Sequence, residues 1–125
     1  MLPMILGLML MMPLGAQSAP DRSFRELVDD CRVSVHLAND RFKGMSGIDA
    51  SLSAYCVGYL RGAVDFLYLA AAPIACVPVN VTAEELARVI VKIADQQPDL
   101  LHQDMSLGVG RALALTYPCP KEKAD

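Results

Sequence analysis

Two cysteines bracket an apolar, helix-like run of the chain, which reads CVGYLRGAVDFLYLAAAPIAC from Cys56 to Cys76. A helix that continues to Ala72 separates its two ends by roughly 24 Å, at the usual rise per residue. A disulfide needs its two Cα atoms within about 7 Å of each other. We therefore expect Cys56 and Cys76 each to bind another part of the chain.

The chain has four cysteines, and four cysteines in a short exported protein are typical of two disulfides. Because consecutive helices joined by short loops pack antiparallel, Cys31 should lie near the level of Cys56. The same argument places Cys76 beside Cys119. We predict the disulfides Cys31–Cys56 and Cys76–Cys119, and a second pairing, Cys31–Cys76 with Cys56–Cys119, stays open.

The chain opens with an uncharged apolar run, MLPMILGLMLMMPL, followed by GAQSAP. The small residues Ala16 and Ser18 fit a secretory cleavage site, although no Lys or Arg precedes the run. It is also shorter than the ~17–25 residues of a membrane-spanning helix. We expect a signal peptide over residues 1–18, cleaved between Ser18 and Ala19, and a periplasmic domain over residues 19–125 with no membrane association after cleavage.

Apolar residues recur at helical spacing in four segments, and no segment alternates long enough to be a strand. We expect helices over residues 23–39 and 49–72, a third that starts at the Thr82–Glu85 capping box, and a fourth from Pro98 to Thr116. Residues 39–47 read as a loop. The sequence therefore predicts an all-α domain, a compact bundle of about four helices stapled by two disulfides.

Nothing in the chain marks it as an enzyme or a metalloprotein. His36 and His102 are isolated, the carboxylates are scattered, and no Cys-x-x-Cys spacing occurs. The formal net charge is −3 with interspersed signs, so nucleic acid is not an expected partner. We expect no catalytic residue, no metal and no cofactor, which leaves an exported helical binding module.

Gly58 and Gly62 lie one helical turn apart, a spacing that lets another backbone approach closely. We interpret the pair as core packing, with a dimer surface as the alternative.

An ordered set of residues resembles the Rap/Tai-type immunity family, periplasmic proteins that neutralise peptidoglycan amidases delivered by type VI secretion systems. The set runs from Cys31 to Cys119, and its remaining members are Cys56, Gly58, Tyr59, Leu60, Gly62, Cys76, Pro78, Val81, Thr82, Leu86, Pro98, Ala112, Leu113, Tyr117 and Pro118. The resemblance implies a compact helical fold of the HdeA kind, essential disulfides, frequent homodimers, and occlusion of a papain-like active site in the toxin. It assigns the residues of this set to the fold and transfers no toxin contacts.

The sequence leaves three functions open: an immunity protein that inhibits an amidase, a small acid-stress chaperone of the periplasm, and a helical carrier of an apolar ligand. For the first, loops and helix ends can fill a groove without disturbing a stapled core. We therefore expect partner contacts from two polar segments, whose residues are Asn39, Asp40, Arg41, Phe42 and Lys43 in the first and Asp99, His102 and Asp104 in the second.

Overall fold

The structure is a computed structural model that describes residues 22–121. The predicted signal peptide and its cleavage site between Ser18 and Ala19 lie outside the described residues. The elements are, in order, α1 (Phe24–Asn39), α2 (Gly47–Leu69), α3 (Ala83–Gln96), the 3-10 helix η1 (Pro98–His102) and α4 (Met105–Thr116). Apart from one isolated bridge between Ser23 and Asp104, the described chain is helix and loop. The all-α prediction is confirmed.

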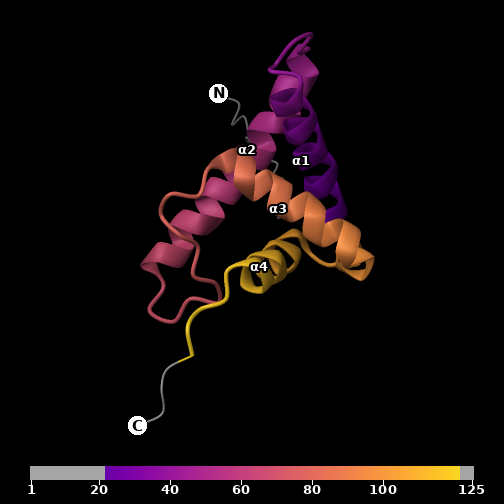
Figure 1. The fold of residues 1–125 in the computed structure, drawn as a ribbon. Coiled ribbons are helices and arrows are strands. Elements are labelled where there is room, and N and C mark those ends of the chain that lie inside the picture. Colours follow the sequence, from indigo (N-terminus) through magenta and orange to yellow (C-terminus); the bar gives the residue numbers. More distant parts are fainter. Residues whose placement is uncertain (1–21, 122–125) are drawn as a thin grey trace, which may run out of the picture.

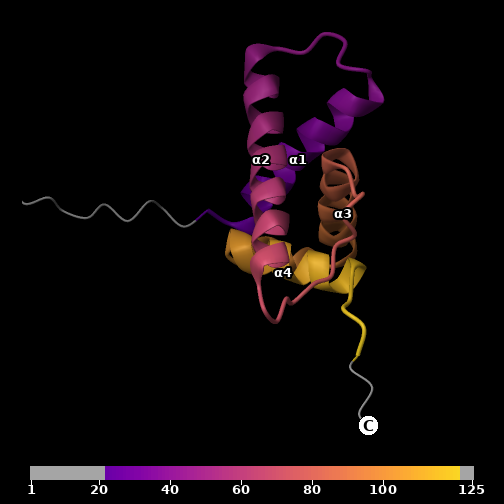
Figure 2. The ribbon, with the colours of Figure 1, turned by 90° about the vertical axis from the view of Figure 1, so that its left-hand side faces the viewer.

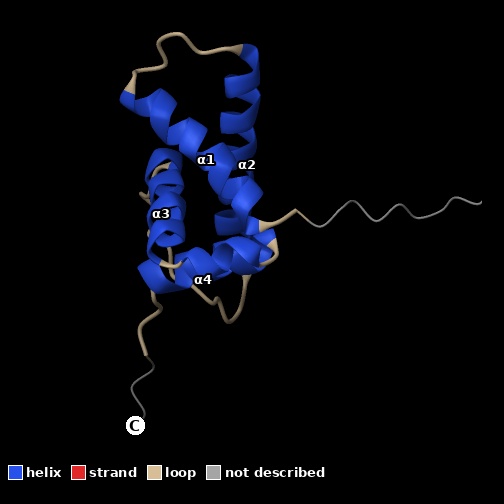
Figure 3. Ribbon diagram, turned by 90° about the vertical axis from the view of Figure 1, so that its right-hand side faces the viewer, coloured by secondary structure: helices blue, strands red, loops and turns tan. Residues whose placement is uncertain are grey.

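Helix α1 is the central element, because it packs against α2, α3 and α4. Figures 2 and 3 show α4 lying crosswise at one end of the molecule, while the α1–α2 loop forms the opposite end. The core lies where the four helices meet, and its largest fully buried side chains are Phe24, Leu27, Leu60, Leu86, Ile90 and Leu113.

Both predicted disulfides are present, Cys31–Cys56 with Cα atoms 5.2 Å apart and Cys76–Cys119 with Cα atoms 4.8 Å apart. The first joins α1 to α2 and is fully buried. The second joins the segment before α3 to the segment after α4, and Cys76 is exposed. A backbone hydrogen bond of 2.8 Å from Cys76 N–H to the Tyr117 carbonyl reinforces that connection.

Helix α2 differs at both ends from its expected span. It begins at Gly47, where the Ser46 side chain accepts a hydrogen bond of 3.1 Å from Asp49 N–H. It ends at Leu69 instead of continuing to Ala72. The proline ring of Pro73 clashes with a helical carbonyl four residues earlier, and that carbonyl belongs to Leu69. The helix therefore ends a full turn before the proline.

The capping box at the start of α3 is confirmed, with Thr82 and Glu85 each accepting the other's backbone N–H. Just before it, the Pro78 carbonyl accepts a hydrogen bond of 3.3 Å from the Tyr68 hydroxyl. These contacts tie the extended connector to α2 on one side and to α3 on the other.

The prediction of a single helix from Pro98 to Thr116 is wrong, because the helix is interrupted between η1 and α4. At the break the backbone is extended and pairs with the segment before α1. Phe24 N–H donates to the Gln103 carbonyl (2.9 Å), and Met105 N–H donates to the Arg22 carbonyl (3.0 Å). These two hydrogen bonds take the place of the helical ones that a continuous helix would form.

Candidate functional site

The two predicted partner-binding segments lie at opposite ends of α1. Residues 39–43 stand at its C-terminal end, and the segment from Asp99 to Asp104 lies beside its N-terminal end, held there by the Ser23–Asp104 bridge. Sixteen helical residues span roughly 24 Å. The structure therefore does not bring the two segments into one site.

We call residues 40–46 the tip loop, because they form the end of the molecule farthest from α4 (Figures 2 and 3). The loop continues α1 through a Schellman motif: Phe42 N–H donates to the Leu37 carbonyl (2.7 Å) and Arg41 N–H to the Ala38 carbonyl (3.2 Å). This motif requires a left-handed backbone just after the helix, and glycine usually provides it.

Here non-glycine residues occupy the left-handed region, Arg41 with φ 53° and Phe42 with φ 61°. Each such residue costs about 1–2 kcal/mol. Gly44 follows with φ 67° and no such cost. The Phe42 side chain is 58% exposed, so burial of its ring offsets little of this strain.

Both ends of the tip loop are fixed to the helices. The Asn39 side chain accepts a hydrogen bond of 2.7 Å from the Arg88 guanidinium on α3, which also binds Glu84 at 2.9 Å. His36 Nε2 lies 3.2 Å from the Asp40 carboxylate. Ser46 caps α2 at the other end. Between these fixed ends, the loop exposes Arg41, Phe42 and Lys43.

The second predicted segment is polar and exposed at Asp99, His102 and Asp104. Pro98 opens η1, and Asp104 is the N-cap residue of α4 without a side-chain cap. Its two neighbours in the fold are the start of α1 and the start of α4.

Sequence analysis missed an apolar groove of about 630 Å³ between α2 and α4. These two helices make little direct contact with each other, and the loop after α2 closes one side through Pro73 and Ile74. We call it the α2–α4 groove. The groove could have been predicted from the composition of α2. Apolar residues occur on all sides of this helix, which is more than a single buried face requires. Further lining residues are Tyr59, Ala63, Phe66, Leu67, Val109 and Leu113.

The interpretation of Gly58 and Gly62 as core packing is wrong, because both line this groove. A Cβ atom at either position would meet nothing within 4 Å. The glycine that does permit a close approach is Gly108 on α4, where a Cβ atom would lie 2.2 Å from Cγ of the Phe24 ring.

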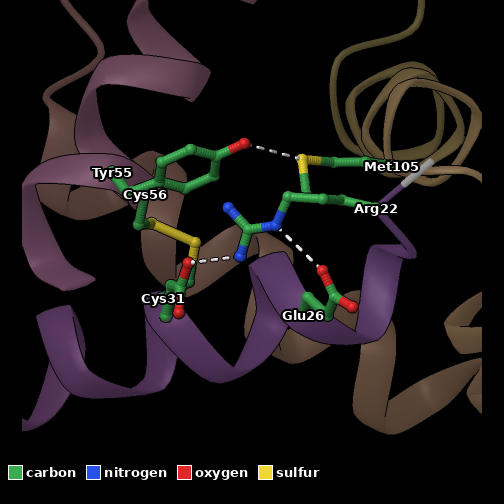
Figure 4. Close-up of polar contacts among 7 residues, drawn as sticks. Arg22, Glu26, Cys31, Tyr55, Cys56 and Met105 are labelled. Carbon is green, nitrogen blue, oxygen red and sulfur yellow. Dashed lines mark hydrogen bonds and ion pairs between the residues drawn. A yellow bond between two sulfur atoms is a disulfide. The ribbon is translucent and has the colours of Figure 1, made fainter. Parts of the chain in front are cut away.

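A polar cluster around Arg22, which the sequence did not indicate, joins three helices (Figure 4). Its guanidinium donates to Glu26 (2.8 Å) and Asp30 (3.2 Å) on α1 and lies 4.1 Å from the centre of the Tyr55 ring on α2. The Tyr55 hydroxyl in turn donates to Met105 Sδ on α4 at 3.8 Å. Among residues 22–121 no buried side-chain nitrogen or oxygen lacks a hydrogen-bond partner. We therefore assign this cluster a structural role, in which it connects α1, α2 and α4.

The resolved pKa shifts have structural causes. The pKa of Arg22 is raised, chiefly by its hydrogen bond to Glu26, and that of Arg32 is raised chiefly by its hydrogen bond to Asp95. Burial is the main cause that raises the pKa of Tyr59, and electrostatic interaction with Tyr55 raises it further. Burial is also the main cause that raises the pKa of Tyr117, and the nearby charge of Glu85 raises it further. All four shifts keep the side chain in its usual charge state at neutral pH.

The described residues contain no free cysteine and no group of three side chains arranged for a metal ion. His36 and His102 stand at opposite ends of α1. No helix between residues 22 and 121 is both long enough and apolar enough to cross a membrane. The surfaces that stand out are therefore the tip loop and the α2–α4 groove, which are suited to binding.

Comparison with known proteins agrees with the resemblance seen in the sequence. The model of the family described as Rap1a immunity proteins matches residues 23–119, a span that holds both disulfides and every described helix. No curated protein and no solved structure matches the chain. Proteins of this family are not enzymes, and an immunity protein implies a cognate toxin as its partner. The chain belongs to the Rap1a immunity protein family.

Proposed function

We propose that the protein is a periplasmic immunity protein that binds a peptidoglycan amidase delivered by type VI secretion and inhibits it by occluding the active site. The observation that carries the proposal is the family match over residues 23–119. The exposed features of the fold support occlusion as the mechanism, because they are a loop with a left-handed backbone and an apolar groove. Both can cover a surface, and neither can cleave a bond.

Export is the second part of the proposal. Disulfides form and persist in oxidising compartments such as the bacterial periplasm, and this chain holds two. A peptidoglycan amidase acts in the same compartment. Cleavage between Ser18 and Ala19 would release a chain in which Arg22, the first described residue, is already tied to α1 and α2.

A homodimer is the third part, and we assign it to the α2–α4 groove. The occupant we propose is a second copy of the chain, packed along Gly58 and Gly62, where nothing of its own chain lies above the helix. Phe66 and Ile74, which are 71% and 63% exposed, border the groove and would be buried by the partner. Large exposed apolar patches of this kind mark interaction sites.

The dimer is tested by sedimentation of the wild type, Gly62→Lys and Ser51→Lys, which is an equal change at an exposed position near the start of α2. Gly62→Lys should give a folded monomer, and Ser51→Lys should stay dimeric. A monomeric wild type would reject the dimer, and binding of a fluorescent fatty acid to that monomer would favour the alternative of an apolar-ligand carrier.

The immunity role is tested by co-expression in the periplasm with type VI peptidoglycan amidases, beginning with any that is encoded beside this gene. Cells should survive when the protein is present and lyse when it is absent. A cytoplasmic version of the amidase without its export signal is the control for toxicity unrelated to the cell wall. Lysis of cells that contain folded, disulfide-bonded protein would reject the proposal.

A further inference from the structure

The tip loop concentrates three features that occur together nowhere else on the described surface. It has consecutive non-glycine residues in the left-handed region, Arg41 and Phe42. It exposes a large aromatic ring, Phe42, and the residues directly before and after it in the sequence, Arg41 and Lys43, are cationic and exposed.

The strained backbone serves to present the Phe42 ring to solvent. The Schellman hydrogen bonds fix the direction in which the chain leaves α1, and the Arg88–Asn39 contact holds the end of that helix to α3. A strained conformation persists where the surrounding structure determines it, and such positions cluster at ligand clamps and binding sites. The backbone at Phe42 is therefore pre-organised, so little backbone freedom remains to be lost when a partner covers the loop.

The chemistry of the loop indicates the kind of partner surface. Exposed aromatic and arginine side chains are enriched among the residues that dominate protein interfaces. The one acidic side chain within the tip loop, Asp40, faces His36, whereas neither Arg41 nor Lys43 has an ion pair within residues 22–121. The loop thus carries an exposed apolar ring and two cationic side chains on three consecutive residues.

We propose that Phe42 is the anchor of the toxin-binding surface, inserted into an apolar recess of the folded toxin that is bordered by carboxylates. This inference rests on the proposed function and names the part of the chain that performs it. The segment around Asp99 and His102 does not share this role, because it is polar and lies at the other end of α1.

The test compares Phe42→Ala with Leu107→Ala, the loss of a similarly exposed apolar side chain (60%) on α4 that lies outside both the tip loop and the lining of the α2–α4 groove. The probe is the purified amidase identified by the co-expression test, with its nucleophile replaced so that it cannot act. Calorimetry gives the Kd of each variant, and thermal melting shows that each is folded. Phe42→Tyr, which keeps the ring, is the rescue.

Phe42→Ala should weaken binding by roughly 30-fold or more, the size expected for loss of a dominant interface residue. Leu107→Ala should change the Kd by less than about threefold, and Phe42→Tyr should restore most of the affinity. An unchanged Kd for a folded Phe42→Ala protein, with the wild type binding tightly, would overturn the anchor and leave the immunity role standing. A large loss in Leu107→Ala alone would move the anchor to α4. A wild type that does not bind the amidase would reject the immunity role and the anchor together.

Discussion

At the scale of single residues, Gly62 of α2 and Gly108 of α4 have opposite structural roles. Gly62 faces the open α2–α4 groove, and Gly108 faces the Phe24 ring. The spacing of Gly58 and Gly62 predicts a helix face without side chains, but it does not predict which element, if any, packs on that face. The packing partner depends on how α4 crosses the other helices, which no local sequence pattern encodes.

The matched substitutions Gly62→Ala and Gly108→Ala should therefore change stability in opposite directions. Gly62→Ala should raise the free energy of unfolding of the monomer, measured at a protein concentration too low for dimers, by about 1 kcal/mol, because alanine is the better helix former and its Cβ meets nothing of its own chain. Gly108→Ala should lower it by about 1–3 kcal/mol, because its Cβ overlaps the fully buried Phe24 ring. Urea unfolding measures both; equal effects would contradict the packing described.

Arg41 provides a second residue-scale prediction. Arg41→Gly should raise the free energy of unfolding by about 0.5–1 kcal/mol, because glycine removes the left-handed strain while adding some freedom to the unfolded chain. The same change at the helical position Arg61 should lower it by about 1 kcal/mol. Thermal melting of the two variants compares them directly, and destabilisation by both would show that Arg41 is not strained.

The positive φ at Arg41 could not be read from the sequence. Gly44 lies only three residues later and is the obvious candidate for a helix-ending left-handed residue. Arg41 takes the left-handed conformation because the hydrogen bonds to the Leu37 and Ala38 carbonyls require it. The residue at which α1 ends determines which carbonyls are free to accept those bonds. Helix ends are set by such competition, whereas the presence of α1 follows from its apolar period.

At the scale of elements, the disulfide pairing could be predicted in two steps: helix length excludes Cys56–Cys76, and antiparallel packing of neighbouring helices favours the observed pairing over the one that stayed open. The early end of α2 could also have been inferred from Pro73, since the proline acts on a carbonyl four residues before it. The break before α4 could not. It depends on backbone hydrogen bonds to Arg22 and Phe24, which are about 80 positions away in sequence and come close only in the folded protein.

The buried Cys31–Cys56 disulfide provides the element-scale prediction. Cys56→Ser should lower the free energy of unfolding by about 2–5 kcal/mol, because the bridge that joins α1 to α2 is lost and a thiol and a hydroxyl remain in the core. Chemical unfolding under non-reducing conditions gives the value, with the reduced wild type as the control. A melting temperature within a few degrees of the wild type would contradict the importance of this bridge.

At the scale of the whole molecule, the contacts that stabilise the fold lie apart from the surfaces proposed to bind partners. The Arg22 cluster and the buried disulfide fasten α1 to its neighbours, while the tip loop and the groove face outward from opposite parts of the structure. The fold class was predictable from the period of the apolar residues and the cysteines. The groove was not, because it is a space between elements that are distant in sequence.

Processing provides the whole-molecule prediction. The protein recovered from the periplasm should begin at Ala19 and should contain no free thiol, because the leader is removed and all four cysteines are paired. Intact mass measurement with and without alkylation checks both points. A retained leader would reject cleavage, and four alkylated cysteines in the exported protein would reject the oxidised fold.

The central claim is that this chain disarms an amidase by covering its active site. The most direct measurement is a titration of peptidoglycan hydrolysis by the purified amidase with increasing amounts of the protein, together with the Kd for the amidase's nucleophile variant. We predict that hydrolysis falls to the background at about one chain per amidase, and that the nucleophile variant binds as tightly as the active enzyme. Full hydrolysis in the presence of excess folded protein, or binding that requires the intact nucleophile, would contradict the account.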